Sequence, residues 1–157
     1  KMCLNHLRKE PELPENLIVA MLANIAVETG GTFDYKTKQK GRLCPAVGLF
    51  QFDPRGAGLF KLYQEYLEHT REDDSAEAQL NMLVDILLGV WKAGVTYLGS
   101  GNVRKLLQAA DKSPLEATRA FSDLILRPGK PHMARRLNAA EEVQAFIANV
   151  KSQEEQK

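Results

Sequence analysis

The sequence predicts a mainly α-helical protein that folds as a single domain around one buried helix. Residues 15–28 contain no glycine or proline and are apolar on nearly every side, which is typical of a helix at the centre of a core. The chain of 157 residues shows no internal repeat and no linker, and its length fits one domain. Further segments carry helical periodicity or capping signals, at 59–69, 74–91, 103–110, 113–126 and 132–150.

Capping residues mark where several of these helices begin and end. Pro14 suits a helix start, and Gly30-Gly31 suits a helix end. Asp74 followed by Glu77 has the form of a capping box. The strongest boundary signal is Ser113-Pro114-Leu115-Glu116, which combines an N-cap serine, a proline at the first helical position and a glutamate at the third. These signals predict separate helices joined by short connections.

The remaining segments predict irregular structure. Residues 32–53 are polar and basic and then carry glycine and proline, a pattern that favours a loop or a short hairpin. Glycines favour a break in the helical pattern at 94–101. We expect residues 1–12 and 151–157 to be loosely ordered, because chain ends are the segments with the fewest packing partners.

Charge and composition argue against some classes of function. The chain has 21 Lys and Arg against 20 Asp and Glu, a net charge of +1, which gives no electrostatic reason to expect nucleic acid as a partner. Four basic residues nevertheless cluster late in the sequence, at Arg127, Lys130, Arg135 and Arg136. No apolar run reaches the length that predicts a membrane span.

Neither the first residues nor the cysteines carry a signal for secretion or for a disulfide framework. Residues 1–15 lack the apolar centre of a secretory signal. Two cysteines, Cys3 and Cys44, are few for a domain of this size, and free thiols are the expectation.

Glu28 is the first candidate for chemistry. It ends the apolar helix at 15–28, one turn after Asn24 and Ile25 on the same face. Apolar neighbours and the negative end of the helix dipole both disfavour the charged carboxylate, and a protonated carboxyl is what a general acid requires. The alternative is a glutamate that reaches solvent where the helix frays, and the periodicity alone leaves both interpretations open.

Two blocks of sequence resemble the active-site signature of the lysozyme superfamily. The first is Asn24-Ile25-Ala26-Val27-Glu28-Thr29-Gly30-Gly31, and the second is Gly48-Leu49-Phe50-Gln51-Phe52-Asp53. They are similar to the motifs of goose-type lysozymes, lytic transglycosylases and phage tail-associated lysozymes. Phe121 and residues 127–136 resemble the closing segment of the phage tail-lysozyme group. The resemblance implies a lysozyme-like domain in which residues 48–53 form the cleft wall opposite the helix that ends at Glu28.

The same resemblance implies roles for three residues. Glu28 matches the catalytic acid, and Gln51 matches a polar cleft residue that binds sugar or orients water. Asp53 matches a carboxylate that goose-type enzymes carry after their glutamine, which makes it the candidate base for positioning water. If residues 48–53 are extended, Gln51 and Asp53 point to the same side. The alternative for Asp53 is an N-cap of the turn at Pro54.

One departure from the goose-type pattern bears on the mechanism. Those enzymes carry another acidic residue between the glutamate and the Gly-Leu-x-Gln motif, whereas residues 36–47 contain no Asp or Glu. Asp34 is the nearest carboxylate, and we expect it to cap the loop. The departure puts two-carboxylate hydrolysis in doubt. A lytic transglycosylase needs only one acid, because the 6-hydroxyl and N-acetyl groups of the substrate assist.

Several other residues are candidates for contact with the substrate. Asn24, Tyr35, Phe50 and Tyr97 are predicted to line the cleft, although core packing is the stronger expectation for Phe50. Basic residues at 36–42 are candidates for contact with peptide-stem carboxylates, with a solvated loop as the alternative. For Arg127 and Arg135 we expect a structural role, clamping the last helix to the domain, with contact to the substrate as the alternative.

These inferences predict a phage enzyme that cleaves bacterial peptidoglycan between N-acetylmuramic acid and N-acetylglucosamine. Such an enzyme acts at the host wall during entry or lysis, alone as a monomer or with other virion proteins, and needs no metal or organic cofactor. A wall peptidase or amidase is an alternative, although His6, His69 and His132 are scattered and no His-Glu-x-x-His motif is present. Cys44 with His132 is the remaining pair for such an enzyme. A wall-binding virion module without catalysis is the non-enzyme alternative.

Overall fold

The computed structural model describes residues 1–38, 46–52 and 58–156, and within them the fold is mainly α-helical, as predicted. The only β-type pairings in these ranges are isolated antiparallel bridges, Lys38 with Val47 and Val47 with Phe52. The described elements are α1 (Met2–Leu7), α2 (Glu15–Glu28), α3 (Leu59–Thr70), α4 (Ala76–Leu87), α5 (Lys92–Leu98), α6 (Ser100–Lys112), α7 (Pro114–Ala120), the π-helix η1 (Phe121–Leu126) and α8 (Met133–Glu155).

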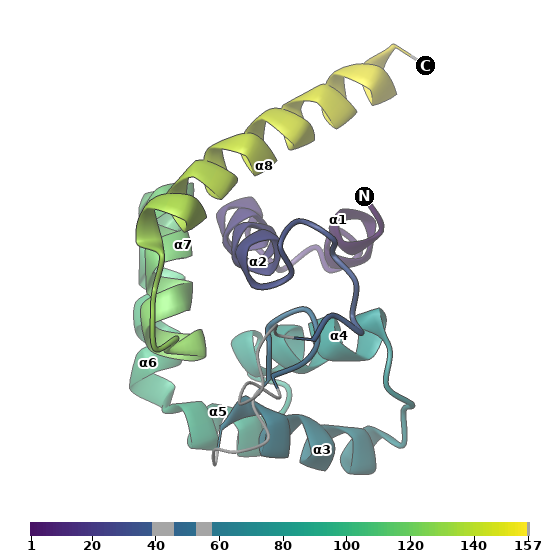
Figure 1. The fold of residues 1–157 in the computed structure, drawn as a ribbon, viewed down its shortest axis with the longest axis vertical. Helices are drawn as coiled ribbons and strands as arrows, with labels where there is room; N and C mark the ends of the chain where they lie inside the picture. Colours follow the sequence, from purple (N-terminus) through teal and green to yellow (C-terminus); the bar gives the residue numbers. More distant parts are fainter. Residues whose placement is uncertain (39–45, 53–57, 157) are drawn as a thin grey trace.

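Helix α2 is the centre of the fold. It packs against α8 and α7 above all, and also against α1, α6 and η1 (Figure 1). Every residue from Leu17 to Ile25 is buried. A helix surrounded in this way must be apolar all round, which is what the sequence of 15–28 predicted. The predicted bounds of this helix match the observed ones.

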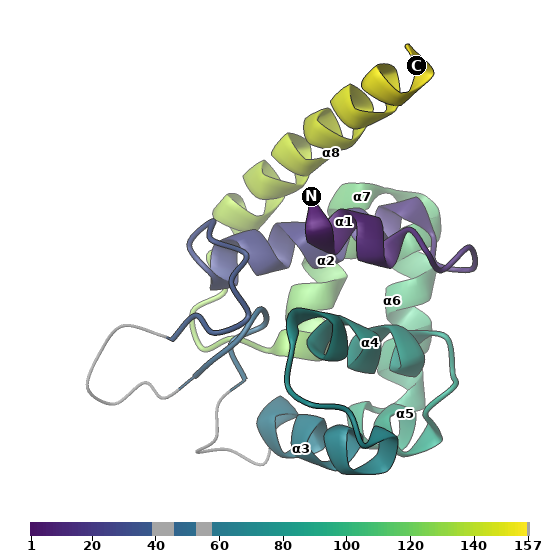
Figure 2. The same cartoon turned by 90° about the vertical axis from the view of Figure 1, so that its right-hand side faces the viewer.

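The other helices leave the end of α2 accessible from one side. Helices α3, α4 and α5 pack together on the side of the molecule away from α8, and α6 leads back to α7. In Figure 2 the loop that follows α2 and the connection between η1 and α8 both lie toward the C-terminal end of α2, and in Figure 1 they stand on either side of that helix. Segments far apart in the sequence therefore meet where Glu28 lies.

Of the predicted helix caps, the structure confirms the one at Ser113 and contradicts the one at Asp74. Ser113 caps α7 as predicted, accepting a hydrogen bond from the backbone N–H of Glu116 at 3.0 Å, with Pro114 at the start of the helix. The predicted capping box at Asp74 is wrong, because the N-cap of α4 is Ser75, which accepts from the N–H of Ala78. Asp74 instead accepts hydrogen bonds from the side chains of Tyr63 and Gln79.

Parts of the two segments that we expected to be loosely ordered, 1–12 and 151–157, are helical. Residues 2–7 form α1, whose Cys3, Leu4 and Leu7 are buried in the core. The helix α8 continues to Glu155, past the predicted end at 150, and both views show its C-terminal half extending beyond the other helices. Ile147 and Val150 are buried and hold this half of α8 to the body.

The predicted helix at 74–91 is shorter in the structure, where α4 is the one helix within that range. α4 ends at Leu87, and Trp91 is the N-cap of α5, which occupies much of the predicted glycine break at 94–101. Gly94 lies inside α5, where its missing side chain lets the helix approach Ile86 and Trp91 closely. No single helix among the described residues has the length and apolar composition of a membrane span, and α4 and α5 reach it only when joined across a bend of 78°.

Burial raises the pKa of three titratable side chains in the core. Cys3 is a free thiol whose pKa is raised by burial, which makes it a poor nucleophile, while Cys44 lies outside the described residues. Tyr63 donates a hydrogen bond to Asp74 and Tyr66 donates one to Asp85, each at 2.6 Å. Burial first, and then the carboxylate acceptors, raise the pKa of both tyrosines.

The raised pKa values of Tyr63 and Tyr66 predict that the folded protein loses stability at alkaline pH. Since their pKa values are higher in the folded protein, their contribution is fully present below the unfolded pKa of about 10 and is lost as the pH rises above it. Urea denaturation between pH 8 and pH 11 measures this. The double variant Tyr63→Phe, Tyr66→Phe is expected to have a shallower decline, and an identical slope in both proteins would contradict the assignment.

Candidate active site

Glu28 lies at the C-terminal end of the buried helix α2, where its carboxylate is partly exposed. Glu28 is the last residue of α2, and the helix is closed by the Thr29 hydroxyl donating to the carbonyl of Ile25 at 2.7 Å. Gly30 and Gly31 follow with φ of 61° and 86°, a backbone conformation that glycine adopts without strain. The predicted helix end at these glycines is therefore confirmed. The Glu28 side chain keeps 16% of its surface exposed.

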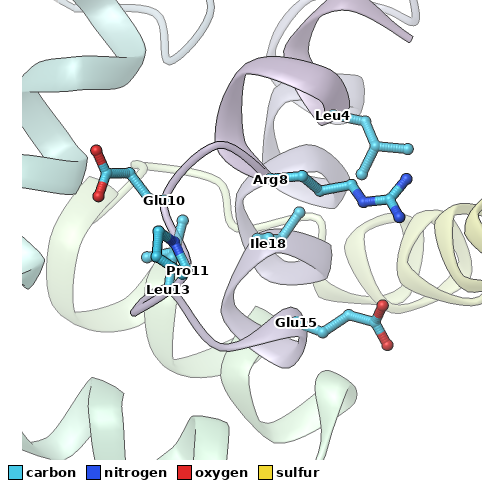
Figure 3. Close-up of a pocket in the computed structure, with 7 residues that line it drawn as sticks. All are labelled: Leu4, Arg8, Glu10, Pro11, Leu13, Glu15 and Ile18. Carbon is cyan, nitrogen blue, oxygen red and sulfur yellow. The ribbon is translucent and has the colours of Figure 1, made fainter.

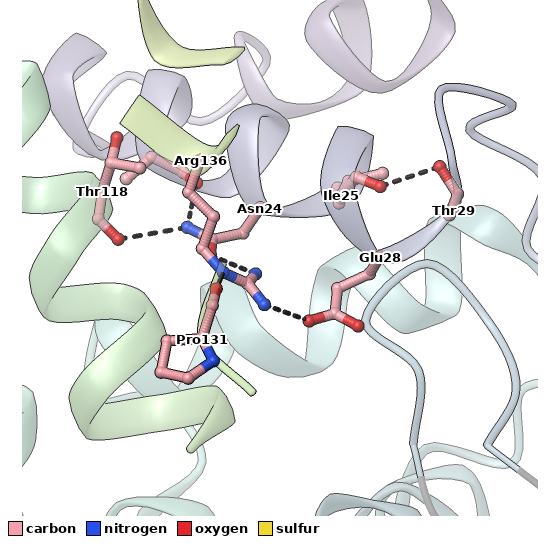
Figure 4. A network of polar contacts seen from close by, with 8 residues as sticks. Asn24, Ile25, Glu28, Thr29, Thr118, Pro131 and Arg136 are labelled. Carbon is pink, nitrogen blue, oxygen red and sulfur yellow. Dashed lines mark hydrogen bonds and ion pairs between the residues drawn. The ribbon is translucent and has the colours of Figure 1, made fainter. Parts of the chain in front are cut away.

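Arg136 of α8 binds this carboxylate from the inside (Figure 4). Its Nη2 donates to Glu28 Oε1 at 2.8 Å, its Nη1 donates to Asn24 Oδ1 at 2.8 Å, and its Nε donates to the carbonyl of Pro131. Arg136 is 1% exposed, so the guanidinium is desolvated and depends on these three acceptors. Arg136 and Glu28 thus form a salt bridge, with 2.8 Å between Nη2 and Oε1.

Asn24 holds Arg136 in place and does not reach the cavity. It is fully buried in α2, and its Nδ2 donates to the carbonyls of Ala20 at 2.8 Å and Thr118 at 3.3 Å. Both of its amide N–H groups and its oxygen thus have partners inside the protein. The structure corrects the expectation that Asn24 lines the cleft, because this fully buried side chain lies behind Arg136 and is not part of the cavity lining.

A cavity of about 1020 Å³ opens beside Glu28. Its first wall is the end of α2, with Val27, Glu28 and Thr29. The second wall comes from the loop after α2, with Thr37, Lys38, Ala46, Phe50 and Gln51. Residues 126–136, from the end of η1 to the first turn of α8, supply a third wall. Within the described part of the chain, Glu28 is the one carboxylate that lines this cavity.

The second wall is a tight turn and not an extended strand. Val47 and Phe52 exchange backbone hydrogen bonds at 3.0 and 2.8 Å, so residues 48–51 form the turn between them. Gln51 has a φ of 53°, in the left-handed region. The condition for Gln51 and Asp53 to point to the same side, an extended 48–53 segment, is therefore not met. Asp53 itself lies outside the described residues.

Gln51 faces the cavity but is tied to the wall. Its Nε2 donates to the carbonyls of Thr37 at 3.0 Å and Gly48 at 2.9 Å, which joins the two parts of the loop. Its Oε1 has no hydrogen-bond partner in the part of the chain that the structure describes. The side chain is thus held by its donor end, while its acceptor end is buried.

Gln79 anchors the same wall to α4. This residue is 2% exposed, and its Oε1 accepts from the N–H of Leu49 at 2.9 Å, while its Nε2 donates to the carbonyl of Tyr35 at 3.2 Å and to Asp74 Oδ1 at 3.1 Å. One buried amide therefore ties both ends of the wall to the core. Asp34 accepts from the N–H of Lys36 at 2.9 Å, which confirms its predicted role as a cap of this loop.

The contact between Gln79 and the wall predicts that Gly48→Ala is destabilising. A Cβ at Gly48 would lie 2.7 Å from Gln79 Oε1, at a position where φ is +96°. Gly31→Ala is the matched control, since Gly31 has a φ of +86° but open space around its Cα. We expect both variants to lose about 1 kcal/mol to backbone strain, and Gly48→Ala to lose more through the clash. Thermal denaturation measures the difference, and equal losses would contradict the contact.

The remaining predicted contacts divide between core and distant surface. Phe50 lines the cavity but is 2% exposed, and its ring packs against Phe52 and Phe121 with centroids 6.1 and 5.8 Å away, so core packing is its main role. Tyr35 and Tyr97 are not among the residues that line the cavity. Tyr97 is exposed on α5, where its hydroxyl lies 3.5 Å from the carbonyl of Gly58. Of the predicted site residues that are described, the cavity brings together Glu28, Gln51 and Phe50.

Comparison with protein families identifies the group to which this arrangement belongs. A model of the phage tail lysozyme family matches residues 1–147. The chain belongs to the phage tail lysozyme family. No curated protein and no solved structure matches it. Membership in a lysozyme family confirms the resemblance inferred from the sequence and makes the chain a phage peptidoglycan hydrolase of the glycosidase type.

Arg136 is a site residue of this phage tail lysozyme that the sequence did not predict. Its signal was present, because it lies in the basic run that resembles the closing segment of phage tail lysozymes, but nothing local distinguished it from its neighbour Arg135. Arg135 is exposed and lines the cavity, whereas Arg136 is buried one residue later. Only the packing of α8 on α2 buries Arg136 and leaves Arg135 exposed.

A second, smaller cavity lies elsewhere in the molecule (Figure 3). It has a volume of about 170 Å³ and lies around the connection between α1 and α2, with Arg8, Glu10, Pro11 and Glu15 among its lining residues. Glu15 begins α2 and Glu28 ends it, so the helix separates this cavity from the candidate active site. The larger cavity is therefore the one that concerns the lysozyme chemistry.

Proposed function

We propose that this enzyme cleaves the glycan bond between N-acetylmuramic acid and N-acetylglucosamine, with Glu28 as the general acid. The observation that carries the proposal is the position of Glu28, a partly exposed carboxyl in the wall of a cavity of about 1020 Å³. A cavity of this size accommodates sugar units of a glycan strand. Glu28 then donates a proton to the glycosidic oxygen as the bond to the anomeric carbon breaks.

Arg136 restricts how Glu28 performs this role. Its guanidinium contacts Oε1, and we propose that the transferred proton is carried on Oε2. The guanidinium prevents rotation of the carboxyl, so one oxygen is held for the substrate. Arg136 is thus a positioning residue.

Two chemical outcomes follow from the proton transfer. In hydrolysis, water adds to the anomeric carbon of muramic acid, positioned by Gln51 and by Asp53 as the base. In the transglycosylase route, the 6-hydroxyl of the same sugar forms the new bond and yields a 1,6-anhydro ring. The single carboxylate among the described lining residues favours the second route, and a base role of Asp53 favours the first.

Product analysis tests the proposal. Purified peptidoglycan is digested with the enzyme, and the fragments are identified by mass spectrometry. New reducing ends establish hydrolysis, and 1,6-anhydro ends, lighter by one water, establish transglycosylation. Freed amino groups with intact glycan strands would overturn the proposal in favour of a peptidase or amidase. Binding to the wall without any new end would favour the non-catalytic wall-binding module.

A further inference from the structure

The opening of the active-site cavity carries a concentration of positive charge. Lys38 from the second wall and Arg127, Lys130 and Arg135 from the third wall line the cavity, and all four side chains are exposed. Against these four and the buried Arg136, the described lining offers one carboxylate, Glu28. The whole chain has a net charge of only +1, so the positive charge here is a local feature. We call these four residues the cationic rim.

Among the described residues, the cationic rim is not neutralised by salt bridges. The salt bridges recorded between described residues do not include any of its four members. The third wall itself contains no compensating charge, because no Asp or Glu occurs between Asp123 and Glu141 in the sequence. Like charges held together repel one another, and a cleft lined by one sign of charge attracts ligands of the other sign.

The third wall holds its cations on a stiffened backbone. Pro128 and Pro131 fix two φ angles, and the carbonyl of Pro131 accepts the Nε of the buried Arg136. Arg127 is also anchored, since its Nε donates to the carbonyl of Leu124 at 3.2 Å. The contacts that position Glu28 therefore also position the segment that carries Lys130. Such preorganisation lowers the entropy lost when a ligand binds.

We propose that the cationic rim binds the free carboxylates of the peptide stems of peptidoglycan. This inference rests on the proposed function, in which a glycan strand lies in the cavity. The N-acetylated sugars next to the scissile bond are neutral, whereas the stem attached to each muramic acid carries carboxylates. The stem thus supplies negative charge at the cavity opening when the glycan is bound. The planar guanidinium of Arg127 or Arg135 matches a carboxylate in a bidentate fashion, and Lys130 and Lys38 add point charges.

Binding of a soluble stem peptide tests the cationic rim without any cleavage. The probe is the free tetrapeptide stem, titrated into the full chain and followed by NMR, beside the same peptide with its carboxylates amidated. The variant Lys130→Gln, Arg135→Gln is expected to bind the free acid about fivefold or more weakly, a modest effect because the cations are exposed. The matched control is Arg104→Gln, Lys105→Gln, which removes two exposed cations of α6 that do not line the cavity. This control is expected to keep wild-type affinity.

Three binding results would overturn the inference. One is equal affinity of wild type and the Lys130→Gln, Arg135→Gln variant for the free acid. Another is an equal loss of affinity in the α6 control, which would mean a general charge effect. The third is equal or tighter binding of a poly(glycerol phosphate), which would assign the rim to phosphate and not to stem carboxylates.

Digestion of two substrates connects the rim to catalysis. Stem-bearing peptidoglycan is compared with the same material after an amidase has removed the stems. For the wild type we expect faster cleavage of the stem-bearing strand at low salt and a decline of this preference as salt is added. The ratio of the two rates is expected to fall in Lys130→Gln, Arg135→Gln, and an unchanged ratio contradicts the inference. If the enzyme leaves glycan intact, the proposed function fails, while the peptide titration still decides on the rim.

Discussion

Replacing Glu28 by glutamine is expected to lower the rate of peptidoglycan cleavage by about 10²- to 10⁴-fold, the usual contribution of a general acid. Glutamine has the same shape as glutamate but carries no transferable acidic proton. Its amide oxygen still accepts the hydrogen bond from Arg136, so the change removes the chemistry and keeps most of the geometry. Release of soluble fragments from purified wall measures the rate.

The control must separate lost chemistry from lost folding. Glu28→Gln removes the negative partner of a buried arginine, so its thermal midpoint and circular dichroism are measured in parallel. Glu142→Gln, an exposed position of α8, makes the same chemical change away from the cavity and is expected to retain wild-type activity. A folded Glu28→Gln protein that degrades the wall at the wild-type rate would remove Glu28 from the mechanism.

Replacing Arg136 by methionine is expected to destabilise the fold by about 3–5 kcal/mol, the range for breaking a buried ion pair. Methionine fills much of the same volume but leaves Asn24 Oδ1, Glu28 Oε1 and the carbonyl of Pro131 without their donor. Each orphaned buried acceptor has a desolvation cost that nothing offsets. For a domain of this size the loss corresponds to a fall of roughly 10 °C in Tm.

Two further variants sharpen this prediction. Arg136→Lys keeps the positive charge but cannot reproduce three donors in one plane, so we expect an intermediate loss of stability. Arg135→Met changes the neighbouring, exposed arginine and is expected to alter stability by no more than about 0.5 kcal/mol. Equal effects of Arg135→Met and Arg136→Met on Tm would contradict the asymmetry that the packing of α8 creates.

What the sequence determined by itself is largely local. The all-round apolar pattern of 15–28 identified α2 as the central helix, Gly30-Gly31 identified its end, and Glu28 followed as the residue at that end. Ser113 and Pro114 identified the start of α7. Caps, glycines and periodicity act through hydrogen bonds and torsion angles within a few residues, so they are readable along the chain.

The details of the cleft wall depended on competition between local signals and tertiary partners. Gln51 follows an apolar segment that suits a strand, yet it adopts a left-handed conformation in the turn closed by Val47 and Phe52. Asp74 has the spacing of a helix cap, yet it accepts from Tyr63 and Gln79 instead. In both cases hydrogen bonds to buried groups outweighed the local preference.

Only the tertiary structure decided which side chains share the active site. Arg136 and Glu28 are 108 positions apart, and no local pattern records that α8 packs on α2 with this register. The same packing buries Asn24 behind Arg136 and brings residues 126–136 to the cavity as a third wall. Partners this far apart are set by the packing of complete helices, and desolvation then makes one arginine a buried ion-pair partner and leaves its neighbour at the cavity opening.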